Sequence, residues 1–180
     1  RNMLHDTWTI RWREYTADTY TYGSKIEFRD DKSVAFENSL IPPATVIHRW
    51  YSRTNFQTKR MEPTLPLIDG ERPYEITLHA DVADEDKNPL IMRIVFYDRY
   101  DNEAESIIVR EKKVMFKPSL KTYSYCVELI SGGEVNFVFR SLQIREISKE
   151  ELDEEQNRIA QIKKDSCKDK GMRKKNRKVK

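Results

Sequence analysis

The side chains of this sequence that could do chemistry are few, and they are not spaced for catalysis. Its three histidines, His5, His48 and His79, belong to no metal-binding or nucleophile motif. The five glycines form no glycine-rich phosphate loop, and the two cysteines have no zinc-ligand spacing. We therefore expect a protein without catalytic activity, metal or cofactor. Two cysteines with no disulfide framework also favour a reducing compartment, the cytosol.

Clustered carboxylates occur at residues 84–86 and again at residues 98–103. A glycosidase needs two carboxyl groups about 5 to 10 Å apart across a cleft, and calcium takes clustered oxygen ligands. Turns collect aspartate in any case. The second cluster lacks the spacing of an EF-hand loop and is interrupted by Arg99, so an ordinary turn is the favoured interpretation.

Aromatic residues beside hydrogen-bonding groups are the more informative pattern. Sugars stack their C–H faces on aromatic rings, while amides, carboxylates and guanidinium groups bind the hydroxyls. Two short stretches have this composition, and they supply our candidates for binding a carbohydrate or a partner protein: Trp50, Tyr51, Arg53, Tyr97, Asp98, Arg99 and Tyr100. For any single aromatic residue, packing in the core or at a protein interface is the competing interpretation.

The element that must position four of these seven candidates is the stretch 89–102, PLIMRIVFYDRYDN. Its apolar residues alternate between two faces: Leu90, Met92, Ile94 and Phe96 on one, Ile91, Val95 and Tyr97 on the other. A strand that is apolar on both faces lies in the middle of a two-layer structure. The polar turn DRYDN follows it, so the core leads directly into a possible recognition surface.

The rest of the chain to Ile147 reads as short strands. Residues 74–82 alternate between apolar and polar, which predicts a half-buried strand with Glu75, Thr77, His79 and Asp81 facing water. In the last strand the apolar positions shift parity after Phe139, which predicts a bulge near Ser141. Roughly ten such strands between Thr7 and Ile147 are typical of all-β sandwiches and barrels. Residues 1–147 are therefore expected to form one β-domain.

The composition changes at Ser148. Ser148 and Glu151 form a capping box, which predicts a helix over residues 148–165. Residues 166–180 carry eight Lys or Arg against one Asp, and we expect a disordered basic tail. Anionic lipid or an acidic partner would suit it, but a solubilising role is favoured.

With no groove-reading element in the chain, we expect no nucleic-acid partner. No apolar run reaches the ~20 residues that span a bilayer.

Several stretches together resemble one known family. RWYSRTNFQ, LPLIDGERPYEITLHADV, PLIMRIVFYDRYDN and FVFRSLQIREI are similar to the smallest of the accessory Sec system proteins. Gram-positive bacteria use that system to export serine-rich-repeat adhesins. The resemblance spans most of residues 8–147 and does not extend to the segment after Ser148.

The resemblance implies an antiparallel, two-sheet jelly roll like that of carbohydrate-binding modules. It also implies a non-catalytic adaptor in the cytoplasm, peripherally associated with the membrane translocase. The expected partners are two larger accessory Sec proteins, one like an inactive glycosyltransferase and one like an α/β-hydrolase that acetylates N-acetylglucosamine. The glycosylated adhesin and the accessory motor ATPase are the other expected partners. A free-standing carbohydrate-binding module or lectin is the alternative.

Overall fold

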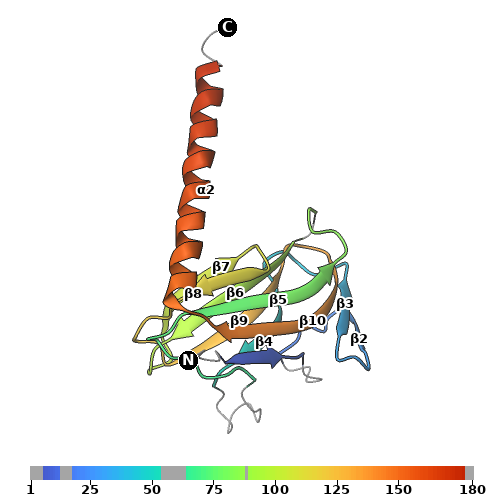
Figure 1. Cartoon of the computed structure of the whole chain (residues 1–180). Helices are drawn as coiled ribbons and strands as arrows, with labels where there is room; N and C mark the ends of the chain where they lie inside the picture. Colours follow the sequence, from blue (N-terminus) through green and yellow to red (C-terminus); the bar gives the residue numbers. More distant parts are fainter. Residues whose placement is uncertain (1–5, 13–17, 54–63, 88, 177–180) are drawn as a thin grey trace.

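Two antiparallel β-sheets pack face to face, and one long helix leaves them (Figure 1). The computed structural model describes residues 6–12, 18–53, 64–87 and 89–176. Within them, the six-stranded sheet has the order β2–β3–β10–β5–β8, with β1 also paired to β10. The four-stranded sheet has the order β4–β9–β6–β7. The expected all-β, two-sheet antiparallel sandwich with a C-terminal helix is confirmed.

The strands of the six-stranded sheet are β1 (Thr7–Ile10), β2 (Lys25–Phe28), β3 (Val34–Asn38), β5 (Tyr74–Val82), β8 (Lys113–Phe116) and β10 (Val135–Glu146). Those of the four-stranded sheet are β4 (Val46–Tyr51), β6 (Leu90–Tyr97), β7 (Glu103–Val109) and β9 (Ser124–Ser131). The helix is α2 (Lys149–Asn176).

Strand β6 occupies the interior position that its apolar pattern predicts, between β9 and β7. Its inward residues Leu90, Met92, Ile94 and Phe96 are all buried in the core between the sheets. On the opposite face Val95 is buried, and Ile91, Arg93 and Tyr97 are half-buried. The inner face of this strand is thus buried, while its outer face is partly exposed and lines a cleft.

The parity change in β10 is a register irregularity at the expected place. The pairing of β10 with β5 shifts between Phe139 and Ser141, and this shift keeps both Phe139 and Leu142 in the core.

The half-buried strand β5 is also confirmed, with one exception. Glu75 was expected to face water but is buried, because its carboxylate lies 3.3 Å from Arg145 Nη2 and 3.7 Å from Lys113 Nζ.

Helix α2 is longer than its composition predicted. We expected the helix to end near residue 165 and a disordered tail to follow, but the helix continues to Asn176. The prediction was wrong because it treated a charge-rich segment as disordered. Lys and Arg are good helix formers, proline is missing from the segment, and cations near a helix C-terminus suit the helix dipole. Residues 177–180 lie outside the described part of the chain.

Candidate functional site

A row of three charged side chains crosses the outer face of the four-stranded sheet. Arg49 on β4 pairs in register with Glu128 on β9, and Glu128 pairs in register with Arg93 on β6. Because residues opposite each other on neighbouring strands point to the same face, the three side chains meet. We call them the charged triad.

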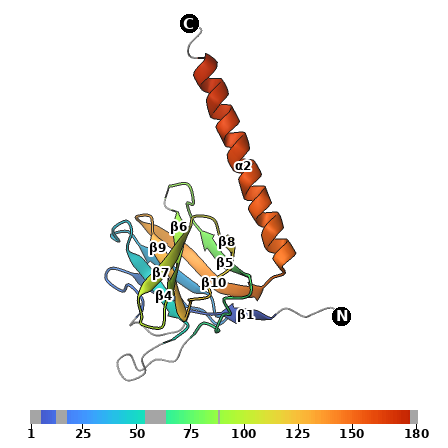
Figure 2. The ribbon, with the colours of Figure 1, turned by 90° about the vertical axis from the view of Figure 1, so that its left-hand side faces the viewer.

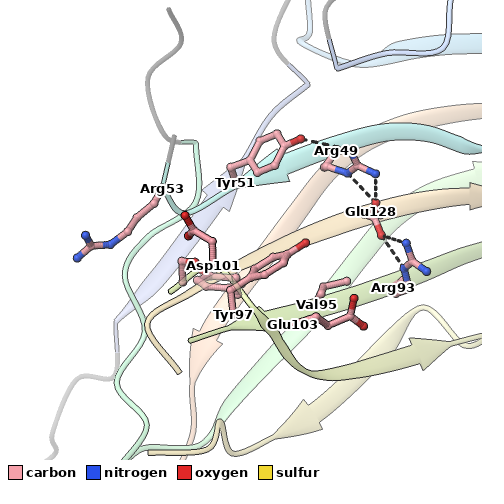
Figure 3. A pocket seen from close by; sticks show the side chains of 11 residues that line it. Arg49, Tyr51, Arg53, Arg93, Val95, Tyr97, Asp101, Glu103 and Glu128 are labelled. Carbon is pink, nitrogen blue, oxygen red and sulfur yellow. Dashed lines mark hydrogen bonds and ion pairs between the residues drawn. The ribbon is translucent and has the colours of Figure 1, made fainter. Parts of the chain in front are cut away.

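The geometry of the charged triad is that of a nearly enclosed carboxylate between two guanidinium groups. The Nε atoms of Arg49 and Arg93 each donate a hydrogen bond of 2.6 Å, one to each carboxylate oxygen of Glu128. The Glu128 side chain is only 2% exposed, whereas the arginine side chains are 36% and 38% exposed. Figure 3 shows Glu128 between the two arginines. Two cations for one anion leave a net positive charge at the floor of the site.

Two tyrosines flank the charged triad. Arg49 Nη1 donates to the Tyr51 hydroxyl at 3.3 Å, and the Arg49 guanidinium lies 6.0 Å from the centre of the Tyr51 ring. Burial alone would lower the pKa of Arg49, but its hydrogen bonds to Tyr51 and Glu128 raise that pKa, so the guanidinium stays charged. The second tyrosine is Tyr97, whose hydroxyl lies 3.7 Å from Cys126 Sγ.

Tyr97 and Cys126 are both held in their neutral forms. Burial raises the pKa of the Tyr97 hydroxyl, and the contact with Cys126 raises it further. Burial also raises the pKa of the Cys126 thiol. A thiol rather than a thiolate is a poor nucleophile. Neither group of the pair is therefore activated as a nucleophile near neutral pH.

The charged triad and the two tyrosines line a cleft of about 420 Å³. Its rim carries Asp101 and Glu103, which supply carboxylate acceptors opposite the arginine donors. Aromatic rings, cationic donors and carboxylate acceptors in one hollow can bind a small polar ligand by stacking and by hydrogen bonds. In the described part of the chain, no group of His, Cys, Asp and Glu is placed to hold a metal ion.

Three of the seven candidate residues from the sequence line this cleft: Tyr51, Arg53 and Tyr97. Arg53 extends away from the charged triad (Figure 3) and lies over Tyr123, 3.9 Å from the centre of the ring. It therefore marks the edge of the cleft rather than its floor.

Three more candidates, Asp98, Arg99 and Tyr100, line a second, neighbouring hollow of about 590 Å³. The Asp98 carboxylate accepts hydrogen bonds from the backbone N–H groups of Tyr100 at 2.8 Å and Asn102 at 3.1 Å. Asp98 thus shapes the turn, while Tyr100 is 75% exposed. The structure divides the DRYDN turn between the two hollows, because Asp101 faces the first.

Trp50 is not a binding residue, and the prediction for it was wrong. A register shift in β4 between Val46 and His48 turns Trp50 toward the core, where its side chain is 1% exposed. Its indole N–H donates to the Arg11 carbonyl at 3.1 Å. A buried ring has no face for a sugar. Its neighbours on the strand, Arg49 and Tyr51, face the cleft instead.

The charged triad was missed by sequence reasoning, although a signal was present. Glu128 stands inside the apolar run YSYCVELI, and Arg93 stands inside the apolar strand of residues 90–97. A charged residue in a strand that is apolar on both sides requires a partner. Two such residues of opposite sign in neighbouring strands would have identified the pair.

The fold and the cleft define a class: a β-sandwich with a polar, aromatic-flanked cleft on the outer face of its four-stranded sheet. The chain belongs to the family described as Accessory Sec secretory system ASP3, whose model matches residues 19–146. A member from Streptococcus gordonii is 38% identical over 132 residues, which covers 73% of this chain and 82% of the relative. A member from Staphylococcus aureus is 25% identical over 161 residues, covering 89% of this chain and 50% of that longer relative.

Two solved structures share the sandwich. A chain in the crystal structure of accessory secretory protein 1, 2 and 3 from Streptococcus pneumoniae is 31% identical, with a TM-score of 0.72 over 78% of this chain and 96% of that chain. A chain in the glycosylation associate protein complex from Streptococcus agalactiae is 32% identical, with a TM-score of 0.72 over 79% of this chain and 45% of that chain. None of the described helices is long and apolar enough to cross a membrane.

Proposed function

We propose that this chain is a non-catalytic adaptor subunit of an accessory Sec complex. In that role it assembles with two larger accessory Sec proteins, one like an inactive glycosyltransferase and one like an α/β-hydrolase acetyltransferase. The complex delivers glycosylated serine-rich-repeat adhesin to the accessory motor ATPase, at the cytoplasmic side of the membrane. The observation that carries the proposal is the match to a chain of the Streptococcus pneumoniae structure, which covers 96% of that chain.

The chemistry of the described residues supports an adaptor rather than an enzyme. Cys126 is buried with a raised pKa. Burial lowers the pKa of His48 to about 3, so it is a poor base near neutral pH. The buried cysteine and the buried histidine of the sandwich are therefore occupied in packing.

Co-expression with the two larger accessory Sec proteins tests the adaptor role. The tagged full chain is expected to retain both proteins through affinity purification and gel filtration. A matched tagged control is a cytosolic β-sandwich of another family, which should retain neither. A chain that elutes alone while the two larger proteins are present and folded would contradict the proposal.

Within this role, we propose that the outer cleft contacts N-acetylglucosamine on the adhesin. The Tyr97 and Tyr51 rings provide apolar faces for the pyranose, and the charged triad provides donors for its acetamide and hydroxyl oxygens. Because the cleft is formed by this chain alone, a free-standing lectin is the second candidate function.

Titration of the full chain and of the complex with an N-acetylglucosamine-bearing Ser-rich peptide separates these roles. Tyr97→Ala is expected to weaken binding roughly fivefold or more, because stacking on a tyrosine contributes about 1 kcal/mol and the cavity left behind loosens the cleft. Tyr22→Ala, which removes a ring that is 77% exposed, is the control and should bind normally. Tight binding by the chain alone, together with no retention of the larger proteins, would favour the lectin.

A further inference from the structure

The match to the family model ends at residue 146, before helix α2 begins. Two views related by a 90° rotation show it projecting away from the sandwich (Figures 1 and 2). A helix that follows the family model's region and is held away from the sandwich calls for a function of its own.

The base of α2 is fixed to the sandwich. Ser148 Oγ accepts a hydrogen bond of 3.2 Å from the Glu151 N–H, and Leu152 is buried. Arg145 Nη2 joins Glu151 at 3.0 Å and Glu75 on β5 at 3.3 Å. The first turn of the helix therefore cannot swing freely, and the rest of α2 extends from it as a stiff arm.

The far half of this arm, residues 163–176, is exposed to solvent at every described side chain. The helix has 28 residues, which at about 1.5 Å per residue makes it ~42 Å long. From Lys163 to Lys174 every side chain is exposed. A polar helix of this kind is only marginally stable in water by itself. Contact with a complementary surface would stabilise it.

The charges of α2 are divided between its two halves. Residues 149–162 have a net charge of −3, with five Asp or Glu against two Lys or Arg. Residues 163–176 have a net charge of +5, with seven Lys or Arg against two Asp. Residues 1–162 together carry −5, which is the +3 of the whole chain less the +8 of residues 163–180. An anionic surface would repel the body of the protein and attract the end of the arm.

The distribution of the cations favours a broad anionic surface. At about 100° per residue, the basic residues of the far half cover roughly 220° of the helix circumference, and Asp165, Asp169 and Met172 share the remainder. Six of the seven cations are lysines, which act as hydrated point charges, whereas nucleic-acid recognition favours arginine. No aromatic residue is available for base stacking. Lysine clusters on a helix are typical of segments attracted to anionic lipids.

We propose that residues 163–176 of α2 bind the anionic headgroups of a lipid bilayer and hold the acidic sandwich at a distance from the membrane. The binding is electrostatic, without insertion of an apolar face. It would give the peripheral membrane association in the proposed function a physical basis, but it does not require the adaptor role. If α2 does not bind the bilayer, the adaptor role can still be tested, and if the adaptor role fails, binding of α2 to the bilayer can still be tested.

Co-sedimentation of the full chain with lipid vesicles tests the proposal. The chain is expected to bind vesicles of phosphatidylcholine with 30% phosphatidylglycerol and not vesicles of phosphatidylcholine alone, and to be released as salt rises from ~0.1 to ~0.5 M. The variant Lys163→Gln, Lys164→Gln, Lys168→Gln, Lys170→Gln should weaken binding on the order of 1,000-fold, because each of the four lysines near such a surface contributes about 1 kcal/mol and 1.4 kcal/mol is a factor of ten. Glutamine is a good helix former, so α2 should persist, as circular dichroism would show.

The matched control removes the same four charges from the sandwich: Lys25→Gln, Lys87→Gln, Lys117→Gln, Lys121→Gln, all at exposed positions. It should bind vesicles as the natural chain does. If both variants lose vesicle binding equally, the attraction is due to overall charge and the proposal is wrong. If the natural chain does not bind the anionic vesicles, the proposal is also wrong. Competition decides the class of partner: if duplex DNA or RNA of equal phosphate concentration displaces the vesicles, the lipid assignment is wrong.

Discussion

His48 packs inside an aromatic cluster of the core. Its ring stacks on Trp12, with 4.2 Å between centres, and meets Trp50 edge-on at 4.6 Å. Its Nδ1 lies 2.7 Å from the Thr19 hydroxyl. The residue is 4% exposed, and burial lowers the pKa of the imidazole to about 3. Folding therefore requires a neutral imidazole.

We predict that acid destabilises the protein through His48. The folded-state pKa lies below the ordinary value of 6.5, so the unfolded chain binds the proton first. Stability from this group is complete above pH 6.5 and falls by ~1.4 kcal/mol per pH unit below it, or about 2 kcal/mol by pH 5. Urea unfolding at pH 7.5 and 5.0 measures the change. His48→Gln should reduce this pH dependence, while His79→Gln, at an exposed position, should retain it.

Glu128 is the residue on which the cleft depends. Glu128→Gln removes the only carboxylate between two arginines, and we expect the free energy of unfolding to fall by about 2 kcal/mol, discounted for the partial exposure of both guanidinium groups. Urea denaturation checks this. The triple variant Arg49→Met, Arg93→Met, Glu128→Met should regain most of the loss, because it leaves no unpaired charge. A fully stable Glu128→Gln protein would show that the triad does not hold the face together.

The sequence predicted some of the residues that line the cleft, but not the charged triad at its base. The aromatic and arginine pattern identified Tyr51, Arg53 and Tyr97, which line the cleft. It failed at Trp50 because one register shift in β4 decides which neighbour points inward. It missed Glu128 because a single sequence does not display which strands are neighbours across a sheet.

Among the elements, strands were predicted more reliably than the end of the helix. Alternation in β5 and β6 and the parity change at Ser141 all carry direct signals, since one buried face fixes the register. Helix α2 beyond residue 165 has no apolar face, so only propensity could indicate it. Composition alone does not distinguish a charged helix from a charged coil.

Gly171 offers a test of the helical far half. It is the only glycine within α2, and a methyl group there would meet nothing within 4 Å. Gly171→Ala should slow amide exchange in residues 163–176 roughly fivefold, because glycine costs about 1 kcal/mol in a helix interior. Gly23→Ala is the contrasting control: Gly23 has a φ of 71°, so alanine there should destabilise the protein. Unchanged exchange at the arm would contradict a helix in that half.

At the scale of the whole molecule, two parts have separate origins of stability. The sandwich has a continuous core between two sheets and matches the family model over residues 19–146. The arm depends on its anchored first turn and on whatever its cations contact. Substitutions in the far half of α2 should therefore leave the unfolding midpoint of the sandwich within the error of a calorimetric scan, since distant sites contribute independently.

The adaptor role is tested most directly by export of the adhesin from the native cell. After deletion of the gene for this chain, we predict that the glycosylated serine-rich-repeat adhesin disappears from the cell surface, as measured by antibody or lectin blotting of wall fractions. A restored copy of the gene should recover it, while the adhesin transcript stays constant. Unchanged adhesin on the surface of the deletion strain would contradict the account.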